Sequence, residues 1–84
     1  MAAYIRIQVL SFGIVRDITG AARLELELAS GTNVRQVRDH LQARYPALSR
    51  LTALFVAVNA EYASPEVVLG PNDEVALIPP VSGG

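Results

Sequence analysis

Residues 33–45, Asn-Val-Arg-Gln-Val-Arg-Asp-His-Leu-Gln-Ala-Arg-Tyr, decide the fold that this sequence predicts. At about 100° per residue, the apolar side chains of this stretch fall on one narrow stripe, formed by Val34, Val37, Leu41 and Tyr45. Asn33 followed by Gln36 matches a capping box, which satisfies free amides at a helix start. The Tyr45-Pro46 pair ends the helix, because the residue before a proline disfavours the α region. One amphipathic helix is therefore expected, ending at about residue 44.

Strand-like segments flank this helix on both sides. Residues 4–12 and residues 23–28 alternate apolar with polar side chains, the period-2 pattern of a strand with one buried face. After the helix, residues 54–58 are mostly apolar, and residues 61–63 follow an Asn-Ala turn as a short strand. Residues 74–78 form the last expected strand, since two prolines follow them.

The connecting segments complete the predicted order of elements. Residues 14–18, closed by Thr19-Gly20, indicate a turn or a single helical turn. Residues 65–69 read as irregular, and residues 70–73 as a turn. One main helix laid across one face of a mixed sheet of about five strands is an α+β fold.

Side-chain parity along the strands predicts an exposed apolar patch. The side chains expected to face the helix are Ile5, Ile7, Val9, Val75 and Leu77. Phe12 and Ile78 then point from the opposite face, and Tyr62 can join them. With no second helix to cover that face, the three residues indicate a docking patch. The alternative is that Phe12 folds round the sheet edge into the core.

Length and composition indicate one small globular domain. A chain of 84 residues with 51% hydrophobic and 18% charged residues can bury a single core. No apolar run reaches the length of a membrane span, and residues 1–6 lack the layout of a signal peptide. Without cysteine, disulfides, thiol catalysis and thiolate metal sites are excluded. We expect a cytoplasmic protein without membrane contact.

The charge distribution bears on the choice of partner. The net charge of −1 argues against nucleic acid. All seven basic residues are arginines within residues 1–50, whereas residues 51–84 carry only acidic charges. The C-terminal half therefore favours a basic partner surface. The chain has no lysine, so an activated C-terminus would meet no lysine amine or cysteine thiol on its own chain.

Side chains that could carry catalysis are sparse. The sequence has no phosphate-binding glycine loop, and its single histidine cannot form a paired-histidine metal site, so no metal is expected. His40 lies about 100° from the apolar stripe of the helix, which indicates a solvated position. The serines have no evident histidine partner for a nucleophilic triad. Nothing here predicts an enzyme that acts alone.

The C-terminal residues 79–84, Pro-Pro-Val-Ser-Gly-Gly, are the strongest functional candidate. Gly83 and Gly84 carry no Cβ, so the terminal carboxylate can thread a narrow channel in a partner. Six residues reach at most about 20 Å, and the proline pair stiffens the base of the segment. The alternative is a frayed end without a role.

These motifs resemble the small, sulfur-carrying subunit of molybdopterin synthase, within the wider ubiquitin-like sulfur-carrier group. The resemblance is carried by residues 72–84, Asn-Asp-Glu-Val-Ala-Leu-Ile-Pro-Pro-Val-Ser-Gly-Gly, and by residues 12–16 and 57–59. Asn72 departs from the glycine common in the family, but asparagine also tolerates turn conformations. The resemblance implies a β-grasp domain over residues 1–78 and a flexible functional tail over residues 79–84.

The resemblance also implies a function centred on the C-terminus. The Gly84 carboxylate would be adenylated by an ATP-dependent activating enzyme and converted to a thiocarboxylate, with Gly83 beside it. The sulfur would pass to cyclic pyranopterin monophosphate inside a synthase of two small and two large subunits, forming the dithiolene of molybdopterin. No cofactor would be bound by the chain itself. The expected partner-binding residues are Phe12, Tyr62, Ile78, Pro79, Pro80, Val81 and Ser82.

Other roles remain open from the sequence. The chain could carry sulfur for thiamine, cysteine or tRNA thiolation, or act as a ubiquitin-like protein modifier. It could also be a β-grasp interaction module with an inert Gly-Gly end.

Overall fold

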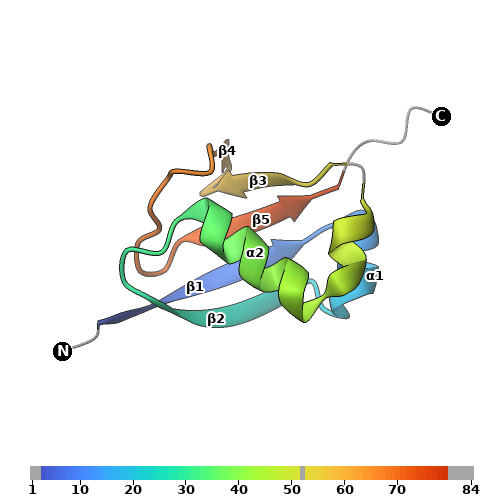
Figure 1. Ribbon diagram of the computed structural model, residues 1–84. Coiled ribbons are helices and arrows are strands. Elements are labelled where there is room, and N and C mark those ends of the chain that lie inside the picture. The colour runs from blue at the N-terminus through green and yellow to red at the C-terminus, as the bar shows by residue number, and fades with distance from the viewer. Residues whose placement is uncertain (1–2, 52, 80–84) are drawn as a thin grey trace.

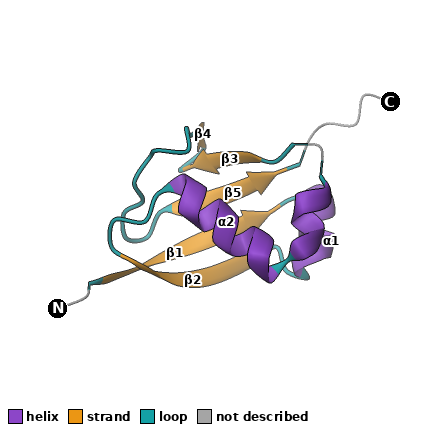
Figure 2. Cartoon of the chain, viewed as in Figure 1, coloured by secondary structure: helices purple, strands orange, loops and turns teal. Residues whose placement is uncertain are grey.

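The computed structural model describes residues 3–51 and 53–79. It shows one mixed sheet crossed on one face by a helix, with a shorter helix at one end of the sheet (Figures 1 and 2). In chain order the elements are β1 (Tyr4–Ser11), α1 (Gly13–Thr19), β2 (Arg23–Ala29), α2 (Val34–Arg44), the 3₁₀ helix η1 (Pro46–Arg50), β3 (Phe55–Val58), β4 (Glu61–Tyr62) and β5 (Glu74–Ile78).

The strand order is β2-β1-β5-β3-β4, so the first and last strands are neighbours in the middle of the sheet. β1 and β5 run parallel, with Val9 opposite Val75, while the other pairs are antiparallel. A parallel pair needs a long crossover, which here contains α2. This arrangement is the β-grasp fold, and the predicted α+β class with one main helix is confirmed.

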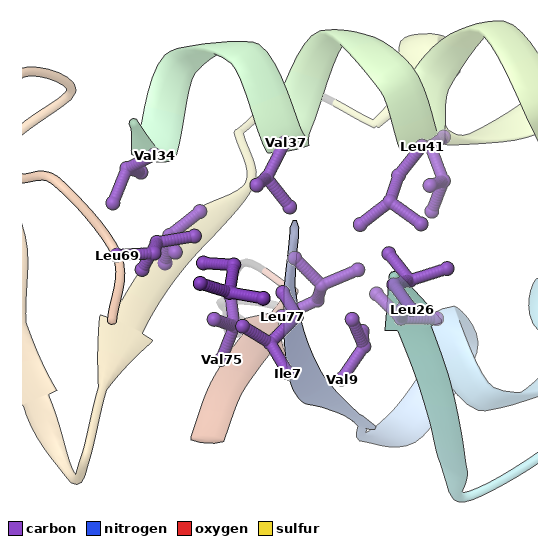
Figure 3. Close-up of a cluster of buried hydrophobic side chains, with 13 residues drawn as sticks. Ile7, Val9, Leu26, Val34, Val37, Leu41, Leu69, Val75 and Leu77 are labelled. Atoms are coloured by element: carbon purple, nitrogen blue, oxygen red, sulfur yellow. The ribbon is translucent and has the colours of Figure 1, made fainter. Parts of the chain in front are cut away.

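The core lies between α2 and the sheet. In Figure 3, Val37 and Leu41 project from α2 towards side chains of β1, β2 and β5. The core residues with no exposed surface are Ile7, Val9, Leu41, Val75 and Leu77, together with Val15 of α1. The parity prediction for the helix-facing side of β1 and β5 is therefore correct.

The start of α2 has the predicted capping box. Oδ1 of Asn33 accepts a hydrogen bond from the Gln36 amide at 2.9 Å, and Oε1 of Gln36 accepts one from the Asn33 amide at the same distance. His40 is exposed, as its helical position indicated.

Three local predictions differ from the structure. The segment after β1 is a seven-residue helix, α1, which is longer than the single turn expected. Phe12 does not belong to β1 but is the N-cap residue of α1. The 3₁₀ helix η1 was not predicted, and it holds Leu48 in the core with 1% of its surface exposed.

Candidate functional site

The sheet face opposite α2 is open and divided into two halves. On the β2 side it is charged: Arg6 lies 3.4 Å from Glu25 and 3.6 Å from Glu27, measured between charged atoms. These pairs are exposed and contribute little to stability, and a single cation faces two carboxylates. On the β3 and β4 side the face is apolar.

One row of residues shows how the apolar half is built. From β2 to β4, the paired positions across the sheet are Arg23, Leu10, Ala76, Ala57 and Tyr62. The two alanines have short side chains, whereas their neighbours Leu10 and Tyr62 are large. A row of small residues between large ones forms the floor of a groove.

The groove encloses about 310 Å³ and is lined by Leu10, Phe12, Ala57, Ala60, Tyr62, Glu74, Ala76 and Ile78. Phe12 is 50% exposed and Tyr62 is 75% exposed, which is unusual for large aromatic side chains in a small domain. The structure therefore brings together the three residues that parity and resemblance singled out. Phe12 does not fold into the core.

The hairpin turn that carries Tyr62 is held to the start of β5. Asn59 and Ala60 have φ angles of 51° and 70°, the positive values that a two-residue type I′ turn requires. Nδ2 of Asn59 donates to Oδ1 of Asp73 at 3.0 Å, and its Oδ1 accepts from the Glu74 amide at 3.0 Å. These bonds fix one wall of the groove relative to its floor.

The tail begins at the end of the sheet that carries α1. Ile78 is the last residue of β5 and lines the groove, and Pro79 follows it directly. A Cβ added to Gly13, whose φ is 53°, would lie 3.3 Å from Cγ of Pro79. The first tail residue therefore passes close over the first turn of α1. The remaining predicted tail residues, Pro80, Val81, Ser82, Gly83 and Gly84, lie outside the described residues, as does the predicted flexibility of the tail.

Several groove residues were not singled out from the sequence. Leu10, Ala57, Ala60 and Ala76 were missed, although a signal existed for two of them. Leu10 has the same parity as Arg6 and Gln8, and Ala76 the same parity as Ile78, so strand alternation places both on the open face. Ala57 and Ala60 reach the groove through the pairing of β3 with β5, and the sequence predicted the turn between β3 and β4 but not that pairing.

Metal-ligand groups and membrane-spanning helices are absent from the part of the chain that the structure describes. Within residues 3–51 and 53–79, no three His, Asp or Glu side chains are grouped to hold a metal ion. None of the helices in these ranges is long and apolar enough to cross a membrane.

Comparison with known proteins adds to this geometry. The sequence model of the ThiS family matches residues 9–84, which include both the groove and the C-terminal glycines. The chain belongs to the ThiS family.

Relatives of this ThiS-family chain carry a consistent name. The molybdopterin synthase sulfur carrier subunit of Mycobacterium tuberculosis is 43% identical over 82 residues, covering 95% of this chain and 99% of the relative. The subunit of the same name from Arabidopsis thaliana is 36% identical over 81 residues, covering 95% of this chain and 84% of the relative. The resemblance read from the motifs is confirmed.

A solved structure supports the fold of this ThiS-family chain. SAMP1, a small archaeal modifier protein from Haloferax volcanii, superposes with a TM-score of 0.81 at 27% identity. The match covers 94% of this chain and 99% of SAMP1.

Proposed function

We propose that this chain is the sulfur-carrying small subunit of molybdopterin synthase, and that its reactive group is the Gly84 carboxylate. The observation that carries the proposal is that the apolar groove extends along β5 to the end of the strand at which the tail begins. Ile78 lines the groove, and the tail starts at the next residue. A partner that covers the groove is therefore placed to receive the C-terminus.

The chemistry requires activation, because a carboxylate is a poor acyl electrophile. A carboxylate oxygen of Gly84 attacks the α-phosphorus of ATP, and pyrophosphate leaves. A donor then supplies sulfur at the oxidation level of hydrosulfide. This sulfur attacks the acyl carbon, AMP is displaced, and the product is a thiocarboxylate. An activating enzyme supplies the ATP site, since the described part of this chain has no phosphate-binding loop.

Sulfur transfer takes place in complex with the large synthase subunit. The sulfur forms a C–S bond to cyclic pyranopterin monophosphate in place of a C–O bond of the precursor, water cleaves the C–S bond to Gly84 and restores the carboxylate, and two such transfers complete the dithiolene. Glycine at positions 83 and 84 leaves no side chain to obstruct a narrow channel. The Pro79-Pro80 pair reduces the conformational entropy that the tail loses on insertion.

The groove is the proposed docking surface for the large subunit. Its exposed aromatic side chains, Phe12 and Tyr62, are of the type that dominates binding energy at protein interfaces. Its floor of short alanine side chains leaves room for apolar side chains of the partner. A complex of two small and two large subunits follows from the proposed family role.

A second candidate is a protein modifier, favoured by the likeness to SAMP1. In that role the activated Gly84 carboxyl would form an amide with a lysine of a target protein. The chain has no lysine of its own, so it would not form chains of itself through lysine. Isopeptide-linked products in cell extracts, absent for a chain truncated before Gly83, would support this role.

Intact mass spectrometry tests the proposal. Incubation with ATP, the activating enzyme and a sulfide donor should raise the mass by about 16 Da, as one oxygen becomes sulfur. Gly84→Val should remain unmodified while the circular dichroism spectrum stays that of the folded chain. The thiocarboxylate form, mixed with the large subunit and cyclic pyranopterin monophosphate, should then yield molybdopterin. Normal thiocarboxylate formation by Gly84→Val would contradict the assigned reactive group, and failure to yield molybdopterin would contradict the pathway.

A further inference from the structure

Tyr62 stands between the open-face groove and a second hollow on the α2 side of β3. This second hollow encloses about 290 Å³, and its lining includes Val34, Arg38, Leu54, Val56, Tyr62 and Pro65. Because Tyr62 lines both, the two hollows form one continuous surface that turns round the edge of the sheet.

The walls of the second hollow are fixed by hydrogen bonds and packing. The Arg35 amide donates to the Pro65 carbonyl oxygen at 3.0 Å, which ties the loop after β4 to the first turn of α2. The rings of Phe55 and Tyr62 meet edge to face, with centroids 6.2 Å apart. A preformed hollow of this kind loses little conformational freedom when a partner fills it.

The hollow has one cationic group and no acidic lining residue. Arg35 pairs with Glu66, with 3.4 Å between Nη2 and Oε1. Arg38, one helical turn further along α2 and half-buried, forms no ion pair within residues 3–51 and 53–79. A carboxylate from a partner would complement its charge.

The outer edge of β3 is incompletely covered beside this hollow. β4 pairs only with Ala57 and Val58, and the Ala63 amide adds one hydrogen bond, to the Val56 carbonyl oxygen at 3.0 Å. In the described part of the chain, no strand continues along the edge at Leu54 and Phe55. A strand edge of this kind can accept an extended segment from another chain.

We infer that the protein covering the open-face groove continues round Tyr62 and lays an extended segment along the β3 edge. An apolar side chain of that segment fills the hollow between Val34, Leu54 and Pro65, and a carboxylate beside it pairs with Arg38. This inference rests on the proposed function, which supplies the large synthase subunit as the partner. Continuity with the groove through Tyr62 favours one partner over a separate ligand for the second hollow, and the charge of Arg38 favours an acidic group on that partner.

Titration calorimetry with the large subunit tests this surface. Arg38→Glu should weaken binding by about tenfold or more, and the affinity should respond less to salt than that of the unmodified chain. Arg44→Glu reverses the same charge on an exposed part of the same helix, and should change the affinity less than about twofold. Urea unfolding of both variants checks that the fold is retained.

Phe12→Ala, measured alongside, separates failure of this inference from failure of the proposed function. If Phe12→Ala weakens binding but Arg38→Glu does not, the open-face groove binds the partner and the second surface does not. If the unmodified chain fails to bind the large subunit, the proposed function is wrong and this inference falls with it.

Hydrogen exchange of the unmodified chain gives a test that needs no variant. Binding of the large subunit should slow exchange of the Leu54 amide at the β3 edge as well as amides around the open-face groove. Protection confined to the groove would overturn the proposed continuation round Tyr62.

Discussion

Nδ2 of Asn59 donates a hydrogen bond to Oδ1 of Asp73 over 3.0 Å, which joins the β3–β4 turn to the residue before β5. Oδ2 of Asp73 accepts from the Gly70 amide at 2.7 Å, so this one carboxylate serves two turns. The pair therefore positions the hairpin that carries Tyr62 against the central strands of the sheet.

Asn59 has two roles: its side chain forms hydrogen bonds to Asp73 and Glu74, and its backbone adopts a left-handed conformation in the turn. Two substitutions should separate their contributions to stability. Asn59→Gly keeps the left-handed backbone but loses the side-chain hydrogen bonds, so the free energy of unfolding should fall by about 1 kcal/mol. Asn59→Ala loses the same hydrogen bonds but keeps a Cβ at positive φ, which alanine tolerates less well than asparagine because it has no polar side chain to bond locally, so it should cost about 2 kcal/mol in total. Urea denaturation measures both values. Equal losses for the two variants would mean that the backbone conformation contributes nothing.

Ala60 offers the opposite change, because its φ of 70° favours glycine. We expect Ala60→Gly to raise the free energy of unfolding by about 0.5 to 1 kcal/mol, since the left-handed conformation costs an alanine more than this. Ala43→Gly, at an exposed position within α2, is the matched control and should lower stability by about 1 kcal/mol. Thermal unfolding that ranks the two variants in the reverse order would contradict the strain assigned to Ala60.

The sequence predicted those parts of the fold that depend on local pattern. The capping box of α2 and the alternation in β1 and β2 depend only on residues that lie within a few positions of one another in the sequence. Both features were predicted and are present in the structure. The 3₁₀ helix η1 was missed because its position depends on the burial of Leu48 in a core that other segments complete. Likewise, the strand order that brings Leu10 beside Ala76 depends on a parallel pairing between the two ends of the chain.

The sequence predicted those residues of the candidate site whose side of the sheet follows from the alternation of side chains along a strand. Phe12 and Ile78 were placed on the open face from alternation, although Phe12 belongs to a helix cap and not to the strand. The exposure of Tyr62 depends on a two-residue strand held by a turn, and the family resemblance supported its choice. The second hollow was not foreseen, because Val34, Leu54 and Pro65 come from three separate segments.

Aromatic truncation tests the docking role of the groove. We expect Phe12→Ala and Tyr62→Ala each to weaken binding of the large subunit by about 2 kcal/mol, or roughly 30-fold, with little change in stability. Tyr4→Ala is the matched control, since Tyr4 starts β1 away from the groove and is 64% exposed. Calorimetry should give the Tyr4 variant the affinity of the unmodified chain, and an equal loss in all three would argue against a localised site.

The last prediction concerns the close approach of Gly13 to Pro79. Gly13 and Gly20 both have positive φ, at 53° and 80°, so alanine at either position should lower stability by about 1 kcal/mol. Only the Cβ at position 13 meets a neighbour, Cγ of Pro79 at 3.3 Å, whereas a Cβ at position 20 meets nothing within 4 Å. Gly13→Ala should therefore shift the NMR signals of the Ile78 amide and the Pro79 ring, and Gly20→Ala should leave them in place. If the Ile78 and Pro79 signals respond equally to both variants, the Cβ at position 13 does not contact Pro79.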